Sequence, residues 1–143
     1  GGGAELAYAA DIRIASTRAV FGNPEPSIGI IAAAGATWRL PALVGESLAK
    51  ELLFTGRRMD AQEALAARLV SSVHPPEELL SAAHAVADRI AAHDPLAIQL
   101  TKRALSAPQG AHPLVDSLAQ AILFESEAKQ TRMTSFLNRG KTS

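Results

Sequence analysis

Two glutamates, twenty positions apart, are the residues of this sequence with the clearest chemical potential. Glu5 follows three consecutive glycines in the run GGGAEL (residues 1–6), and Glu25 ends the run FGNPE (residues 21–25). Two carboxyl groups that share a site can position a water molecule, remove one of its protons and deliver a proton to a second atom. The pair therefore predicts general acid–base chemistry, provided that the fold brings the two side chains together.

The three glycines before Glu5 indicate that another group approaches the backbone there. Glycine costs backbone entropy and has no side chain to bury, so a run of three is not explained by packing alone. A helical pattern follows directly, over residues 5–10. A helix N-terminus preceded by glycines offers free N–H groups and the positive end of the helix dipole to an anion or a developing oxyanion. The alternative is that Glu5 only complements the dipole and that Glu25 is a solvated loop residue.

The elements that must position these residues are mostly helices, with a few short strands. Strands are expected over 12–16, 19–21 and 69–73, and a Gly/Pro-rich loop over 22–30. Asp60 and Asp94 each have the position of a helix N-cap. After the first helix, further helices are expected over 32–43 (limited by Pro41), 47–54 (ended near Gly56), 61–67, 76–92, 95–105, 114–129 and 132–138.

The composition excludes several classes of function. The 143 residues are 48% apolar and contain 14 basic and 14 acidic side chains, so no net field favours nucleic acid or an anionic membrane. There is no apolar run of 18 residues and no cysteine, which excludes a spanning helix of ordinary length, disulfides and thiolate metal sites. The four histidines (His74, His84, His93 and His112) lack metal-ligand spacing, so no metal site is expected.

The two glutamate frames together resemble the enoyl-CoA hydratases of the crotonase superfamily. Other landmarks of that family run nearly from end to end of the chain. They are DIRIAS (11–16), GII (29–31), RLP (39–41), VG (44–45), LFTGRRMDA (53–61), EA (63–64), LV (69–70), Val73 and SFL (135–137). Either glutamate frame alone would be a weak signal, whereas both at this spacing are specific.

This resemblance implies an α/β protein with the crotonase-like ββα spiral fold. Residues 1–75 would form the C-terminal part of the spiral core with the active-site glutamates, and 76–143 a helical region for oligomerisation and coenzyme A contact. This portion would be mostly helical with a few short strands. We expect the chain to be the C-terminal part of a longer protein, whose N-terminal half supplies the second oxyanion donor and much of the coenzyme A site.

The resemblance also assigns roles in the hydration of an enoyl thioester. Gly2 would donate one oxyanion-hole N–H, Glu5 would act as base toward water, and Glu25 would deliver the α-proton. Pro24 would contact the substrate together with Ile28, which matches a position that lines the acyl pocket.

Several positions depart from the pattern of many hydratases. Ala33 stands where a glycine N–H helps hold the water, but a backbone N–H survives the change, so Ala33 stays a substrate-binding candidate. Trp38 is interpreted as a packing or interface residue.

Phe136 and Arg139 match residues that contact coenzyme A bound by a neighbouring subunit, and the alternative is a helix-face Phe and a solvated Arg.

Further implications concern assembly, substrate and location. Family members form trimers or dimers of trimers, act on acyl-CoA thioesters in fatty acid β-oxidation, and use no cofactor beyond the coenzyme A of the substrate. We expect a bacterial cytoplasmic enzyme, with the mitochondrial matrix left open, and no nucleic-acid or membrane partner.

Three alternatives remain. The first is another crotonase chemistry, such as enoyl-CoA isomerase or dehalogenase; most such relatives replace one glutamate, so keeping both favours hydration. The second is a non-catalytic acyl-CoA-binding protein, and the third is a helical interaction module.

Overall fold

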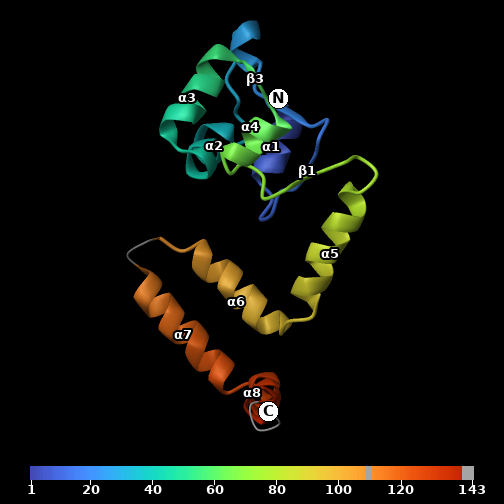
Figure 1. Cartoon of the computed structure of the whole chain (residues 1–143). Helices are drawn as coiled ribbons and strands as arrows, with labels where there is room; N and C mark the ends of the chain where they lie inside the picture. The colour runs from blue at the N-terminus through green and yellow to red at the C-terminus, as the bar shows by residue number, and fades with distance from the viewer. Residues whose placement is uncertain (109–110, 140–143) are drawn as a thin grey trace. The chain divides into compact units, whose positions relative to one another are not determined.

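The computed structural model describes residues 1–108 and 111–139, which divide into two compact units. The first unit is Gly1–His84 and the second begins at Ala85 (Figure 1). This boundary falls inside helix α5 (Leu79–Ala91). The functional division expected at residues 75 and 76 stays a prediction. Within the described ranges, no helix combines the length and the apolar character needed to cross a membrane.

The first unit combines short helices with two small sheets. Strands β1 (Ala15–Ser16) and β4 (Val73–His74) are parallel, and β2 (Val20–Gly22) and β3 (Arg58–Asp60) are antiparallel, with Phe21 opposite Met59. Its helices are α1 (Gly2–Tyr8), the 3₁₀ helix η1 (Glu25–Ile28), α2 (Ala36–Val44), α3 (Glu46–Thr55) and α4 (Ala61–Ala66).

The core of this unit lies among α2, α3, α4 and the strands. Leu40, Met59 and Leu69 are its largest fully buried apolar side chains. Met59 is the middle residue of β3, so the strand that pairs with β2 is anchored in the core. Since β2 ends at Gly22, this pairing fixes the start of the segment that carries Glu25.

Several helix ends confirm the local sequence signals. The Asp60 carboxylate accepts a hydrogen bond from the Glu63 N–H at 2.8 Å and caps α4. Gly56 ends α3 in the left-handed region, with φ of 64°. In the second unit the Asp94 carboxylate accepts from the Ala97 N–H at 3.2 Å and caps α6.

Helix α2 differs from the expectation at both ends. It begins at Ala36 rather than at residue 32, because Gly35 adopts φ of 119° and stands before the first helical turn. Pro41 lies inside the helix and does not end it. The Gly45 N–H donates to the Pro41 carbonyl at 2.9 Å, so a full turn follows the proline.

The strand expected over 69–73 is also wrong in extent, because β4 covers only Val73–His74. The N–H groups of Leu69 and Val70 both donate to the Ala64 carbonyl and close the end of α4 instead. Arg68, which precedes Leu69 in this turn, has a positive φ of 60°. Strand β3 and the 3₁₀ helix η1 were not expected; β3 forms by pairing with β2.

In the second unit, the described helices after α5 are α6 (Pro95–Leu105), α7 (His112–Phe124) and α8 (Glu127–Arg139). Helices α6 and α7 pack against each other (Figure 1). Helix α7 ends at Phe124 instead of Lys129, because the Ser126 hydroxyl accepts from the Lys129 N–H at 3.2 Å and caps α8. Ser126 lies inside the helix expected over 114–129. Because serine is a preferred N-cap residue, Ser126 could have indicated the start of α8.

Candidate active site

Glu5 is a buried carboxylate on α1, only 5% exposed. The helix includes the glycines, since the Ala4 and Glu5 N–H groups both donate to the Gly1 carbonyl. A Cβ at Gly2 or Gly3 would meet no described atom within 4 Å. Packing among the described residues therefore does not explain these two glycines. As first-turn residues, Gly2 and Gly3 have N–H groups that the helix itself cannot satisfy.

A contact from α2 holds the Glu5 carboxylate. Its Oε1 accepts a hydrogen bond from the Ala36 N–H at 3.1 Å, in buried surroundings. Ala36 is the first residue of α2, so its N–H has no acceptor within the helix. The contact satisfies this donor and fixes the direction of the carboxylate.

Glu25 is the second buried carboxylate, 9% exposed, at the start of η1. Its Oε1 lies 3.8 Å from the Gly1 nitrogen, which also donates to the Gly22 carbonyl. Its Oε2 is buried and has no hydrogen-bond partner among the described residues. The Ile30 N–H donates to the Glu25 carbonyl at 3.2 Å and closes the η1 segment.

The charges of both carboxylates act on one buried phenol. Tyr8 is 4% exposed, at the C-terminal end of α1. Burial raises the pKa of the Tyr8 phenol to about 12, and the charges of Glu25 and then Glu5 contribute to the rise. Glu5 and Glu25 are thus both buried in the same unit and both influence the Tyr8 phenol, while their catalytic roles stay predictions.

The predicted substrate contacts belong to the same unit and are exposed. Pro24, Ile28 and Ala33 are all exposed, and Ile28 is 74% exposed. Pro24 lines a cavity of about 290 Å³ together with Gly1. The structure leaves the roles of the three side chains as predictions.

A neighbouring apolar cavity was not predicted from the sequence. It measures about 370 Å³ and is lined by Pro26, Ile30, Ile31, Ala32, Thr37, Leu53 and Phe54. The isoleucine pair after Gly29, in a loop between short helices, was the signal that could have indicated it. Trp38 does not enter the core: it is 62% exposed, and the Arg39 guanidinium carbon lies 3.9 Å from the ring centroid.

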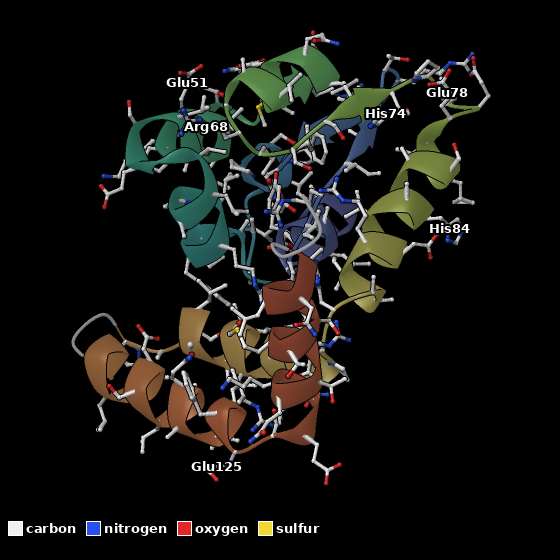
Figure 2. All side chains as sticks on the ribbon, turned by 60° about the horizontal axis from the view of Figure 1, so that its bottom comes forward. Glu51, Arg68, His74, Glu78, His84 and Glu125 are labelled. Atoms are coloured by element: carbon white, nitrogen blue, oxygen red, sulfur yellow. The ribbon has the colours of Figure 1, made fainter. Side chains whose placement is uncertain are left out.

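The remaining candidates lie elsewhere or outside the described side chains. Phe136 and Arg139 belong to α8, but their side chains lie outside the described part of the structure. His74 pairs with the Ser72 hydroxyl at 2.8 Å, and exposed His84 projects outward from α5 (Figure 2). Among residues 1–108 and 111–139, no cluster of three His, Asp or Glu side chains is placed to hold a metal ion.

Comparisons with known proteins agree with the motif reading. The short-chain-enoyl-CoA hydratase of Clostridium acetobutylicum is 40% identical over 150 residues, which cover 99% of this chain and 56% of the relative. The crotonyl-CoA hydratase of Syntrophomonas wolfei is 40% identical over 147 residues, with the same coverage. The chain thus spans about half the length of these curated relatives.

Solved structures show the same likeness in three dimensions. The crystal structure of an enoyl-CoA hydratase from Bacillus anthracis matches with a TM-score of 0.93 at 36% identity, over 97% of this chain and 55% of that one. The predicted crotonase fold, mostly helical here with few short strands, is thereby confirmed. The sequence profile of the enoyl-CoA hydratase/isomerase family matches residues 1–143. The chain belongs to the enoyl-CoA hydratase/isomerase family.

Proposed function

We propose that the chain is part of an enoyl-CoA hydratase, which adds water across the 2,3 double bond of an enoyl-CoA thioester. The observation that carries this proposal is that Glu5 and Glu25, each in its family frame, are both buried in the same unit. Relatives named as a short-chain-enoyl-CoA hydratase and a crotonyl-CoA hydratase support the same reaction.

In this mechanism the two carboxyl groups divide the proton transfers. The Glu5 carboxylate removes a proton from water as the water oxygen bonds to the β-carbon. Glu25 delivers a proton to the α-carbon, and the proton that Glu5 gained from water then replaces it. The Ala36 N–H supports this division because it keeps Glu5 Oε1 in one direction.

The thioester oxygen gains negative charge during the addition, and backbone N–H groups are suited to stabilise it. We assign one such donor to Gly2, which lies in the first turn of α1. Its N–H has no acceptor within the helix, and an added Cβ would meet nothing described within 4 Å. This open backbone supports the oxyanion role.

The proposed substrate is an acyl-CoA thioester, and no separate cofactor is required. Pro24, Ile28 and Ala33 are assigned to the acyl end. Phe136 and Arg139 are assigned to coenzyme A held by a neighbouring subunit of a trimer or a dimer of trimers. We place the enzyme in fatty acid β-oxidation and in the bacterial cytoplasm.

Isotope incorporation distinguishes hydration from the isomerase alternative. The protein at its full natural length is incubated with crotonyl-CoA in ¹⁸O-water, and the product is analysed by mass spectrometry. Hydration places one ¹⁸O atom in a 3-hydroxyacyl product. A product without ¹⁸O, or binding of the thioester without turnover, would contradict the proposal.

A further inference from the structure

Tyr8 is buried, and the charges of both carboxylates raise the pKa of its phenol, but it is not used in the reaction described above. It is on α1, three positions after Glu5, and both side chains are buried. Residues three apart lie on the same side of a helix. Its hydroxyl donates a hydrogen bond to Asn23 Oδ1 at 3.0 Å, in buried surroundings. Asn23 is 1% exposed and precedes Glu25 by two positions.

This hydrogen bond joins the element that carries Glu5 to the segment that carries Glu25. Asn23 lies between the end of β2 and the start of η1. The Ser27 hydroxyl, by contrast, donates within the segment, to the Pro24 carbonyl at 2.7 Å. The Tyr8 hydroxyl therefore supplies a cross-link that the local backbone of η1 does not.

Two further buried side-chain atoms of the segment do not supply a second link of this kind, although Glu25 Oε1 lies 3.8 Å from the Gly1 nitrogen. Asn23 Nδ2 and Glu25 Oε2 are both buried and have no hydrogen-bond partner among the described residues. These atoms therefore do not help to fix the two side chains, although buried polar atoms are normally paired. Oδ1 is the paired atom of the Asn23 amide, and Tyr8 is its partner.

The phenol is also kept in the protonation state that the link requires. Burial and the neighbouring charges of Glu25 and Glu5 raise the pKa of Tyr8 to about 12. The hydroxyl therefore keeps its proton throughout the neutral range and remains a hydrogen-bond donor. A phenol with this pKa is also a poor acid, which argues against direct proton transfer from Tyr8.

We propose that Tyr8 is a positioning residue, which holds Glu25 in its working orientation by hydrogen-bonding Asn23. This inference rests on the proposed function, because it takes Glu25 as the group that delivers the α-proton. The alternative is that Tyr8 only fills the core with its ring and has its hydroxyl satisfied incidentally. The two readings differ in what the hydroxyl alone contributes.

Steady-state kinetics of the protein at its full natural length separate these readings. Tyr8→Phe keeps the ring and removes the hydroxyl, and we expect kcat for crotonyl-CoA hydration to fall about tenfold with KM nearly unchanged. In an Asn23→Ala background the same substitution should change kcat by less than about twofold, because the link is already absent. Val70→Ala, at a buried apolar site, is the control: it should lower Tm and leave kcat unchanged.

Amide hydrogen exchange gives a readout that does not depend on turnover. The Ile30 N–H, which donates to the Glu25 carbonyl, should exchange about tenfold faster in Tyr8→Phe. The Gly45 N–H, which donates to the Pro41 carbonyl, should exchange as in the wild type. Equal acceleration at both amides would indicate general loosening and overturn the inference.

The possible failures can be told apart. If Glu25→Gln loses activity while Tyr8→Phe retains wild-type kcat, the positioning role is wrong and the proposed function stands. If the wild-type protein does not hydrate crotonyl-CoA, the proposed function fails and the positioning role of Tyr8 fails with it.

Discussion

The Glu5 carboxylate accepts a hydrogen bond from the Ala36 N–H at 3.1 Å, across 31 positions of sequence. The contact pairs a free backbone donor with a buried acceptor. Ala36 begins α2 and has no acceptor within that helix, while Glu5 is a buried carboxylate that needs a donor. The orientation of Glu5 thus depends on where α2 starts.

Gly35→Ala tests this dependence. Gly35 has φ of 119°, a backbone conformation that L side chains rarely adopt, so alanine there should shift the start of α2. The Arg39 guanidinium, which a Cβ would overlap, can move aside. We expect a loss of roughly 1–2 kcal/mol in stability and a clear fall in kcat as the Ala36 N–H moves. Gly45→Ala is the matched control, because Gly45 has φ of 82° and open space around it. It should lower Tm and leave kcat nearly intact; similar kcat values for both variants would contradict the account.

Alkaline unfolding tests the environment of Tyr8. The pKa of its phenol rises from the ordinary 10.0 to about 12 in the folded chain, mainly through burial. Between these values only the unfolded state loses the proton, so the contribution to stability is complete below pH 10 and is lost as pH approaches 12. A difference of two pKa units between the folded and unfolded states corresponds to about 2–3 kcal/mol of unfolding free energy.

The measurement is urea unfolding of the wild type and Tyr8→Phe at several pH values from 9 to 12. The difference in unfolding free energy between the two proteins should shrink over this window. A constant difference would show that the phenol titrates alike in both states.

Arg68 stores backbone strain at the end of α4. It has φ of 60° without being glycine, which costs roughly 1–2 kcal/mol, whereas glycine there would cost roughly 0.5–1 kcal/mol in unfolded-chain entropy. Arg68→Gly should therefore stabilise the protein by up to about 1 kcal/mol in chemical denaturation. Arg68→Ala keeps the strain and should give no such gain; equal stabilisation by both would indicate a side-chain effect instead.

The cap of α4 provides a second stability test. Asp60→Ala removes the acceptor for the Glu63 N–H and should cost about 1 kcal/mol of unfolding free energy. Asp60→Asn retains a side-chain oxygen and should cost only a fraction of that. If the two substitutions proved equally harmful, the charge of Asp60 rather than its capping bond would be responsible.

Local chemistry explains which features could be predicted from the sequence. The caps at Asp60 and Asp94 and the glycine end of α3 are decided within a few residues, and the structure confirms them. The two glutamates could be identified because each lies in a dense local frame. The fold followed from those frames through resemblance, because the described strands are only two or three residues long and have little periodicity of their own.

Tertiary contacts explain the rest. Strand β3 forms because β2 pairs with it, and Pro41 is carried inside α2, which packs in the core. The hydrogen bond from the Ala36 N–H to Glu5 joins residues 31 positions apart. The hydrogen bond from the Tyr8 hydroxyl to Asn23 joins residues 15 positions apart. No local pattern specifies such partners. The roles of Gly2, Pro24 and Ala33 depend on the substrate and stay predictions.

The central claim is that Glu5 and Glu25 carry the proton transfers of hydration. Its most direct test is kcat for crotonyl-CoA hydration by the protein at its full natural length, compared with Glu5→Gln and Glu25→Gln. Each amide keeps the shape of the side chain and removes its proton function, so each variant should lose at least ~10²-fold in kcat with smaller changes in binding. Turnover near the wild-type rate in either variant would assign that glutamate to structure and contradict the two-carboxylate mechanism.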